Sequence, residues 1–372
     1  MCKPHGAAEA QPVKRVFISD CEGPISKNDN AFEATARFIP NGDKLFTLIS
    51  KYDDVLADVI KKPGYNAGDT LKLILPFLKA YGVTDECLKK FSAENLVLIA
   101  GSKHTLEHVR RLSDAFIVST SYEHYIKALC DALGFPFENT YCTRISLDKY
   151  VLSSRENSQL RELATEIAQM PMIMIPSTAK SLEDFPEQDR ETVNQLDTIF
   201  WEKISRMGVG IVFRVVKPIG GRQKAEAIKD AVQKTDVQLS DVLYMGDSIT
   251  DVEAFKLVRE NGGLAVSFNG NVYAVKNAEI AVLSENNTVM AVIADLFHRL
   301  GKRETLQVLK TWSPETLKQS PLSKSVLERL FTLYPAKLPK VQIVTPENME
   351  TLIRESSEFR KKVRGEAVGR LG

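Results

Sequence analysis

The chain has 372 residues, of which 44% are hydrophobic and 26% are charged. These proportions are ordinary for a globular protein, and they exclude a disordered or collagen-like chain. Lysine and arginine number 49 and aspartate and glutamate 48, so the formal net charge of +1 creates no strong field toward nucleic acid or an anionic membrane. The length predicts two or three structural units with enough apolar mass for a proper core.

Two further features concern the compartment. No apolar run approaches the roughly 20 residues that a transmembrane helix needs, and the polar N-terminus has no signal-peptide core. The five cysteines form an odd, scattered set without a C-x-x-C pair, which is typical of reduced thiols rather than of a disulfide framework or a zinc site. We therefore expect a soluble, cytoplasmic protein.

Short β-branched apolar runs, each followed by a helical pattern, predict an α/β fold with a Rossmann-like parallel sheet covered on both faces. Ligands bind such sheets beyond the carboxyl ends of the strands, so the residues after each run are the candidates for function. In chain order the runs are 13–19, 115–118, 208–216, 242–245, 264–268 and 280–283, of which we assign 208–216 to a lateral hairpin.

Long helical stretches divide the chain further. About 80 residues after the first run are too many for an ordinary connection, and they predict a small helical domain. The basic residues 360–364 close a polar tail, and a solvated helix end is favoured there over a site for nucleic acid or a partner. The predicted division is a core (12–26, 103–150 and 211–301), a helical cap (27–102), a helical insertion (151–210) and a C-terminal helical extension (302–372).

An acidic pair follows the first run. Asp20 and Glu22 lie two residues apart just past a buried strand, so both side chains point into the same crevice. Such a pair suits a nucleophile with a neighbouring general acid and base, or a divalent metal. Acidic residues at loop starts are also common as caps, so the pair alone decides nothing.

Hydroxyl groups and a lysine come next along the chain. Ser119, Thr120 and Ser121 follow the second run and place three hydroxyls beside backbone amides, where a phosphate could bind. Lys224 opens a helix after a glycine-rich turn and puts a positive charge near a helix N-terminus, itself an anion-binding position. In isolation a solvated surface lysine is the simpler interpretation.

The run 242–245 leads into Gly246, Asp247 and Asp251. The glycine lets the backbone turn sharply, and the two aspartates lie four apart at a helix start, on one face of its first turn. Helix capping could explain one of them. It does not explain three acids converging from two strands, which repel one another unless a hard cation such as Mg²⁺ intervenes.

The order of these groups resembles the four motifs of the haloacid dehalogenase (HAD) superfamily: Asp-x-Asp, Ser/Thr, Lys and Gly-Asp-x-x-x-Asp. The resemblance covers about 150 residues of core, and the last motif is its most specific part. The helical segment directly after the first motif is similar to the C1-type cap of the phosphoserine-phosphatase-like branch. The start of the chain also resembles archaeal members of this type that are named as an energy-converting hydrogenase subunit, a name that says little about chemistry.

The resemblance implies a Mg²⁺-dependent phosphatase acting on a small phosphorylated metabolite. Asp20 would attack phosphorus to form an aspartyl-phosphate, and Glu22 would protonate the leaving oxygen and then activate water. Phosphoryl oxygens would be held by Ser119, with Thr120 beside it, and by Lys224. The implied metal site consists of Asp20, the backbone carbonyl of Glu22, Asp247 and Asp251, with Asp251 binding directly or orienting a metal-bound water.

Glu22 departs from the family pattern, in which the phosphatases usually carry aspartate. The longer side chain must fold back to the leaving oxygen, and an ångström of misplacement can cost about 100-fold in rate. A catalytically weak or inactive protein that serves as a binding or complex subunit is therefore an alternative, and a phosphotransferase is a third possibility. No nucleic acid or membrane is an expected partner, and neither the substrate nor the oligomeric state can be read from the sequence. Asp29, nine residues after Asp20, is expected to cap a helix rather than face the site.

Overall fold

A computed structural model describes residues 14–176 and 178–371. Its centre is one seven-stranded sheet with the strand order β3-β2-β1-β4-β5-β6-β7. All neighbouring strands are parallel except β6 and β7, which are antiparallel. The strands are β1 Val16–Ser19, β2 Asp114–Tyr122, β3 Thr140–Thr143, β4 Val242–Gly246, β5 Leu264–Phe268, β6 Ile280–Leu283 and β7 Lys340–Ile343.

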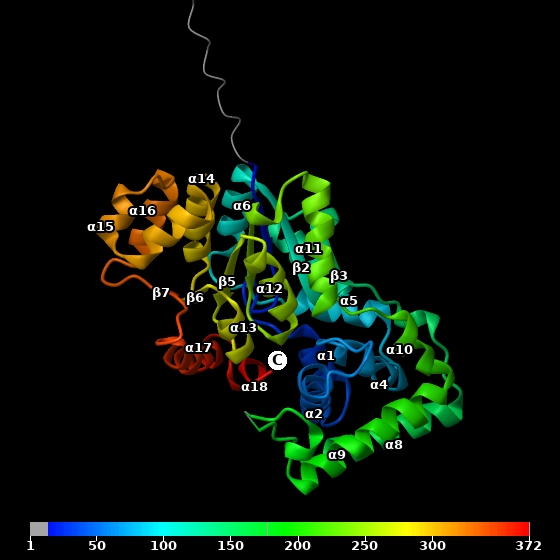
Figure 1. Cartoon of the computed structure of the whole chain (residues 1–372). Helices are drawn as coiled ribbons and strands as arrows, with labels where there is room; N and C mark the ends of the chain where they lie inside the picture. Colours follow the sequence, from blue (N-terminus) through cyan, green and yellow to red (C-terminus); the bar gives the residue numbers. More distant parts are fainter. Residues whose placement is uncertain (1–13, 177, 372) are drawn as a thin grey trace, which may run out of the picture.

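Alternating side chains of the strands pack into two apolar layers, one on each face of the sheet. In β1, Phe17 packs with one layer, while Val16 and Ile18 pack with the other. Helices α6, α7 and α14 cover the first face, and α11, α12 and α13 cover the second (Figure 1). These helices are α6 Ser102–Leu112, α7 Glu123–Leu133, α11 Arg222–Thr235, α12 Val252–Glu260, α13 Val272–Asn277 and α14 Thr288–Lys310. The predicted α/β fold with a mostly parallel sheet is confirmed.

The segment after β1 is helical and lies beyond the carboxyl ends of the strands (Figure 1). Its helices are α1 Asn30–Phe38, α2 Gly42–Asp54, a π-helical turn Val55–Val59, α3 Thr70–Leu73, α4 Leu75–Ala80 and α5 Asp85–Glu94. Asp29 caps α1, since its Oδ1 accepts a hydrogen bond from the backbone N–H of Phe32 at 3.0 Å. The capping role expected for Asp29 is thus confirmed, but Asp29 also lines the cavity that contains Asp20, so the expectation that it would not face the site is wrong.

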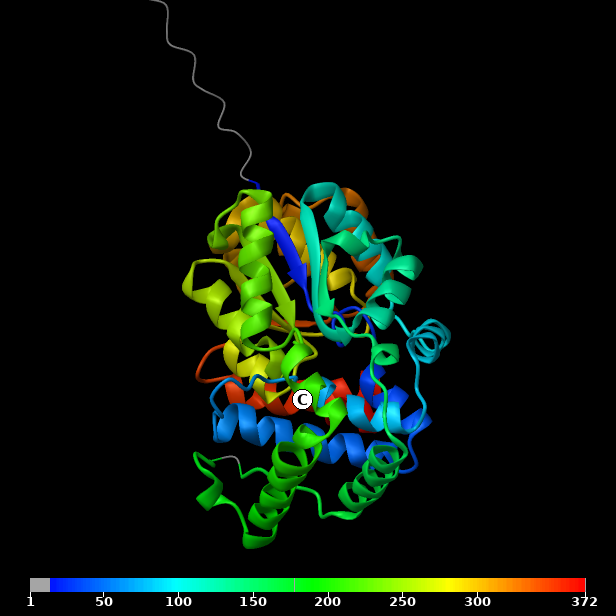
Figure 2. The ribbon, with the colours of Figure 1, turned by 90° about the vertical axis from the view of Figure 1, so that its right-hand side faces the viewer.

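The second insertion packs its helices against this cap segment rather than against the sheet (Figure 2). It contains α8 Ser154–Gln169 and α9 Glu187–Asp197, and a π-helical stretch Thr198–Lys203 and a 3-10 turn Ile204–Arg206 follow. Its apolar side chains join one core with those of α2 and α4, as in the contact of Phe200 with Tyr52 and Phe77. Both insertions therefore share a core of their own.

The prediction of a strand at 208–216 is wrong. The structure has a 3-10 turn Gly208–Ile211 and the short helix α10 Val212–Val215 there. Val209 and Val212 are buried three residues apart, the period of a helix, and a side chain at Gly210 would lie about 2.5 Å from the carbonyl oxygen of Ile204. Close packing against the preceding turn overrides the β-branched composition, since β-propensity depends on context.

Two strands were not expected. β3 has the polar sequence of residues 140–143, and β7 lies in the tail that the sequence predicts to be wholly helical. Because both are edge strands of the sheet, each is paired on one side only, and neither needs a continuous apolar run. The rest of the extension is helical, with α15 Pro314–Gln319, α16 Lys324–Leu333, α17 Met349–Arg364 and α18 Glu366–Gly369.

The described residues contain four of the five cysteines, and these form no disulfide. None of the helices in 14–176 and 178–371 combines the length and hydropathy that a bilayer-spanning segment requires. The start of the expected first strand, at residue 13, lies outside the described residues, as does Cys2.

Asp295 on α14 anchors the C-terminal extension. Its side chain is fully buried, accepts a hydrogen bond from the backbone N–H of Ser323 at 2.6 Å, and pairs with Arg299 at 2.7 Å. Burial works to raise the pKa of Asp295, but the imidazole of His108 at 3.6 Å and hydrogen bonds from Ser323 and Arg299 outweigh it and hold the pKa well below its usual range. The charged carboxylate therefore stabilises the folded state.

We expect Asp295→Asn to lower the free energy of unfolding at pH 7 by about 2 kcal/mol, the scale of hydrogen bonds to a charged group. Because the pKa of Asp295 is lower in the folded than in the unfolded protein, where it is about 3.9, the carboxylate stabilises the folded state at pH values above about 3.9 and progressively less below. The difference in unfolding free energy between the wild-type protein and Asp295→Asn should therefore shrink toward pH 3. Urea unfolding at both pH values measures this. Glu328→Gln removes an exposed pair with Lys324 and should change little; an equal loss in both variants would contradict the anchor.

Candidate active site

Three carboxylates meet where β1 and β4 end side by side. Asp20 follows β1 and its backbone N–H donates to the carbonyl oxygen of Met245 at 2.7 Å, which holds the two strand ends together. Asp247 and Asp251 follow β4, and one oxygen of each of the three carboxylates lies within 4.8 Å of the others. Gly246 makes this possible, because a side chain there would lie 2.4 Å from Cγ of Asp251.

Lys224 is the positive partner of this cluster. It is fully buried near the start of α11, and its Nζ lies 2.6 Å from Oδ2 of Asp20 and 2.7 Å from Oδ1 of Asp251. Burial alone would lower the pKa of Lys224, but the two carboxylates outweigh burial and raise the pKa, so the ammonium group stays charged. A solvated surface lysine, the simpler interpretation of the sequence, is wrong.

Asp20 is 5% exposed, and its surroundings affect the pKa of its carboxyl group in opposite directions. Burial raises the pKa of Asp20 to about 7 against the opposing effect of Lys224, and the carboxylates of Asp251 and Asp247 add to the rise. Its Oδ1 accepts the backbone N–H of Cys21 at 2.6 Å. A cation beside Asp20 would favour the ionised form that a nucleophile requires.

Asp251 is fully engaged within the protein. Its Oδ1 accepts from Lys224 and, at 2.6 Å, from the hydroxyl of Tyr244. Its Oδ2 accepts the backbone N–H groups of Asp247 and Ser248 at 2.8 and 3.0 Å. Burial works to raise the pKa of Asp251, yet Lys224 and these hydrogen bonds lower it. Asp251 therefore fixes the lysine and the loop after β4.

The hydroxyl groups after the apolar part of β2 line the same cavity as Asp20. Ser119 donates to the hydroxyl of Ser121 at 3.1 Å and accepts the backbone N–H of that residue. Thr120 donates to the backbone carbonyl of Ile219 at 3.0 Å, so its hydroxyl joins two segments of the core. Ser119 is thus better placed than Thr120 to exchange its present partner for a ligand.

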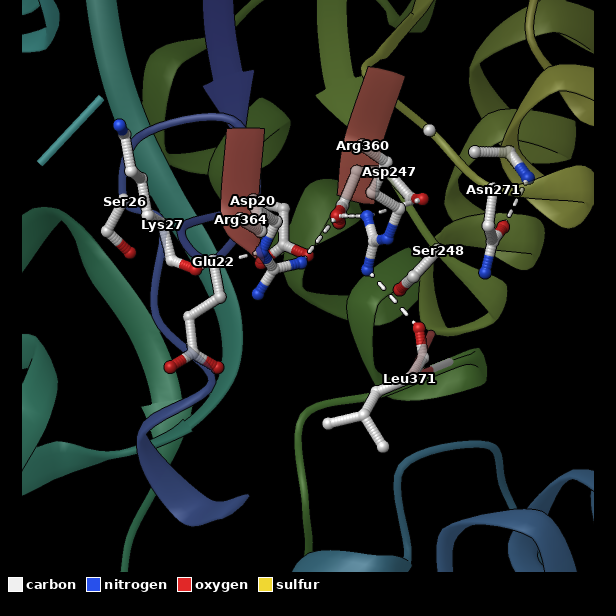
Figure 3. Close-up of polar contacts among 12 residues, drawn as sticks. Asp20, Glu22, Ser26, Lys27, Asp247, Ser248, Asn271, Arg360, Arg364 and Leu371 are labelled. Atoms are coloured by element: carbon white, nitrogen blue, oxygen red, sulfur yellow. Dashed lines mark hydrogen bonds and ion pairs between the residues drawn. The ribbon is translucent and has the colours of Figure 1, made fainter. Parts of the chain in front are cut away.

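Glu22 lines the cavity but turns toward the cap segment. Its Oε1 accepts the backbone N–H of Asn30, the first residue of α1, at 2.6 Å, and Figure 3 shows its carboxylate pointing away from Asp247. Burial raises the pKa of Glu22 well above its usual range, and the nearby carboxylate of Asp29 adds to the rise. A carboxyl group in these surroundings retains a proton that it can donate.

Two arginines that the sequence analysis left in solvent complete the site. Arg360 and Arg364, four residues apart on α17, both bind Oδ2 of Asp247, the latter at 3.1 Å (Figure 3). Their side chains are 3% and 4% exposed. Figure 2 shows this helix, in red, running between the sheet and the blue cap helices. The expectation of a solvated basic helix end is therefore wrong for these two residues.

A signal for these arginines was present in the sequence. Leu352, Ser356 and Arg360 recur every four residues and form the buried face of α17. An arginine on the buried face of a helix indicates a buried partner of opposite charge, because burying an unpaired charge costs too much free energy.

The cavity itself has a volume of about 90 Å³ and is partly covered by the cap segment. Beside the strand-end residues, the two arginines and Leu371, it is lined from the cap by Asp29, Phe46, Ser50, Asp53, Asp54, Gly68, Thr70 and Leu71. Burial raises the pKa of Asp53 to about 8, with the carboxylate of Asp69 adding to the effect. None of these cap residues carried a motif that the sequence analysis could use.

The residues around Asp247 fit a hard divalent cation. The donors are carboxylate oxygens, which Mg²⁺ prefers, and Oδ1 of Asp247 accepts no hydrogen bond from the described residues. Gly23 has a φ of +107°, and its backbone passes so close to Asp247 that a side chain at position 23 would lie 2.0 Å from Oδ2 of Asp247. Asp20, Asp247 and Asp251 together could hold the ion, and Asp247 alone of the three keeps a carboxylate oxygen without a partner among the described residues.

Comparisons with known proteins bear on the fold. No family model matches the sequence, and no curated protein is significantly similar to it. Among solved structures, gene product AF1437 from Archaeoglobus fulgidus superposes with a TM-score of 0.79 at 24% identity, covering 96% of this chain and 99% of that chain.

Two other solved structures align less well. A substrate-bound phosphoserine phosphatase gives a TM-score of 0.44 at 12% identity, over 74% of this chain and 96% of that one. A HAD family hydrolase from Salmonella enterica serovar Typhi gives 0.42 at 10% identity, over 72% and 68%. The chain therefore shares its fold, over nearly its whole length, with the archaeal protein AF1437.

Proposed function

We propose that the protein is a Mg²⁺-dependent phosphomonoester hydrolase of the HAD type that acts on a small phosphorylated metabolite. The observation that carries the proposal is the buried carboxylate of Asp20, 2.6 Å from Lys224 and within reach of two further carboxylates at the carboxyl end of the sheet. Ser119 lines the same cavity. This is the arrangement that the motifs of the sequence imply.

In the first displacement, a carboxylate oxygen of Asp20 attacks phosphorus while the bond from phosphorus to the leaving oxygen breaks. Glu22 gives its proton to that oxygen, and the alcohol departs. Lys224 and Ser119 hold the phosphoryl oxygens, whose charge grows in the transition state. Mg²⁺, held by Asp20, Asp247 and the backbone carbonyl of Glu22, would neutralise charge on the same oxygens.

In the second displacement, Glu22 takes a proton from water, and the hydroxyl attacks phosphorus. The bond to Asp20 breaks, which releases inorganic phosphate and restores the carboxylate. Asp251 acts through its partners, since it fixes Lys224 and the backbone of Asp247 and Ser248. Thr120, within β2, donates to the backbone carbonyl of Ile219 and so holds the turn before α11 against the strand.

Hydrolysis of p-nitrophenyl phosphate in the presence of Mg²⁺ tests the proposal. Sustained release of p-nitrophenol supports it, and a screen of phosphorylated metabolites for phosphate release then identifies the substrate. The absence of turnover from both the chromogenic ester and the metabolites, in a correctly folded preparation, would overturn it.

One observation favours a second function, a non-catalytic binding or complex subunit. Oδ2 of Asp247 already has two guanidinium partners, so the carboxylate is compensated without a metal. In that case the protein would not turn over any phosphomonoester, and the same assay separates the two functions.

We expect the cap to close further when the phosphoryl site is filled. Glu22 binds Asn30 at the start of α1, so the proton donor and the cap move together. The expected connections to the core are 26–28 and 100–102. Where the chain enters and leaves the cap beside them, residues 25–27 and 97–99 are joined by hydrogen bonds from Lys27 N–H to Val97 O and from Ile99 N–H to Ile25 O. Both should be hinges.

Hydrogen exchange with Mg²⁺ and beryllium fluoride, compared with Mg²⁺ alone, measures this closure. Slower exchange is expected along α1 and α2 and at both connections. Asp20→Asn cannot bind the phosphoryl mimic in the same way and should show no change. Identical exchange of the wild-type protein in the two conditions would exclude a moving lid.

A further inference from the structure

A second cavity adjoins the one that contains Asp20. Its volume is about 650 Å³, and Asp54, Arg360 and Leu371 line both cavities. We call it the vestibule. The inner cavity, at about 90 Å³, holds little beyond a phosphoryl group, whereas the vestibule falls in the range of about 300–1,000 Å³ that is typical of ligand sites. The rest of a substrate would therefore extend into the vestibule.

The vestibule is lined by more cationic than anionic side chains. Its described lining includes two carboxylates, Asp54 and Asp58, and six cationic side chains: Lys51, Lys256, Lys276, Arg360, Lys361 and Arg370. Several of these cations are already paired, as Lys51 is with Asp54 at 3.2 Å and Arg370 with Glu366 at 2.9 Å. Lys276 and Lys361 form no ion pair with any residue in 14–176 or 178–371.

Arg360 stands where the two cavities meet. Its Nη1 binds Asp247 and its Nη2 donates to the carbonyl oxygen of Leu371 at 3.3 Å. Its buried Nε has no hydrogen-bond partner among the described residues. A buried donor without an acceptor is costly, and an anionic ligand at this position would satisfy it.

We propose that the vestibule binds a second anionic group of the substrate, a phosphate or a carboxylate several atoms away from the phosphoryl group that is hydrolysed. The inference rests on the proposed function and narrows its substrate class to phosphomonoesters with an anionic leaving group. Arg360 contacts the near end of that leaving group, and Lys276 and Lys361 hold its far end. A neutral leaving group would leave Nε of Arg360 without an acceptor and the two lysines without an anionic partner among the described residues.

Equilibrium binding to the Asp20→Asn protein with Mg²⁺ tests the inference without turnover. Calorimetry compares butyl phosphate, 1,4-butanediol bisphosphate and 4-phosphonooxybutanoate, which differ only in the distal group; 1,6-hexanediol bisphosphate extends the reach. At least one doubly anionic ligand should bind about tenfold more tightly than butyl phosphate, because one charge-assisted contact contributes on the order of 1.4 kcal/mol. The bisphosphate and the carboxylate distinguish the two kinds of anion.

Lys361→Gln and Lys276→Gln, made in the Asp20→Asn background, should each remove most of that advantage and leave the affinity for butyl phosphate unchanged. Lys362→Gln is the matched control, because the neighbouring Lys362 is exposed and pairs with Glu285 outside the vestibule. It should keep the advantage. Loss of preference confined to the vestibule variants supports the inference.

Equal affinity for all ligands, a preference that survives both lysine substitutions, or no binding of any ligand would overturn the inference. Failure of the proposed function looks different. If the wild-type protein hydrolyses p-nitrophenyl phosphate and shows no anion preference, only the vestibule assignment fails. If it prefers the doubly anionic ligands and hydrolyses neither these nor p-nitrophenyl phosphate, the vestibule assignment stands and the hydrolase does not.

Discussion

Asp20→Asn should reduce hydrolysis of p-nitrophenyl phosphate by about a thousandfold or more, the scale on which a lost nucleophile reduces turnover in other enzymes. An amide cannot attack phosphorus, and no other carboxylate stands at the end of β1 against Lys224. The fold should persist, because Lys224 keeps its ion pair with Asp251. Burial disfavours the charged form of Asp20, so its replacement by a neutral amide offsets part of the stability lost with the Asp20–Lys224 ion pair.

The measurement is initial velocity at saturating Mg²⁺, with circular dichroism and thermal unfolding to show that the variant is folded. Asp131→Asn, at an exposed position in the last turn of α7, is the matched control and should retain full activity. If a folded Asp20→Asn protein keeps more than a few per cent of wild-type activity, Asp20 is not the nucleophile.

Removal of the metal is the second large effect. EDTA should stop turnover and Mg²⁺ should restore it, since carboxylates that face a phosphate need a cation between them. Asp247→Asn should raise the Mg²⁺ concentration for half-maximal activity by at least about 100-fold, or eliminate activity. Loss of a residue that only hydrogen-bonds to a metal ligand typically weakens metal binding by about 10–100-fold, so a larger effect indicates a direct ligand.

Metal binding can be followed apart from turnover. Mn²⁺ titration monitored by electron paramagnetic resonance should show one strong site in the wild-type protein and a much weaker one in Asp247→Asn. Glu253→Gln, at an exposed position on α12 paired with Lys256, should bind the ion as the wild-type protein does. An unchanged Mg²⁺ requirement in Asp247→Asn would rule out Asp247 as a ligand.

The strand ends of the core were predictable because they obey local rules. Runs of buried β-branched residues identified β1, β2, β4, β5 and β6, and the polar residues just beyond them had to meet at one edge of a parallel sheet. The same rules predict that Asp20, Lys224, Asp247 and Asp251 lie close together, and in the structure they form one cluster.

What the sequence could not yield depends on tertiary context. The β-branched residues 208–216 form helical turns because the preceding segment packs against them, and β7 pairs only because the extension returns to the sheet edge. Arg360 and Arg364 contact Asp247 from more than 100 residues away, and no local pattern specifies such a contact. The orientation of Glu22 likewise depends on where α1 begins.

The contacts of Arg364 have a consequence for how the protein folds. Besides Asp247, its guanidinium binds the backbone carbonyls of Lys27 and Asn28, so one side chain joins positions that are 337 and 336 residues apart. Contacts of such sequence separation form only after long loops have closed, and they slow folding. The sheet can assemble through β1, β2 and β4 while Asp247 still lacks its cations. The site is therefore among the last parts of the molecule to take shape, and a chain that has regained its secondary structure is not yet a chain with a complete site.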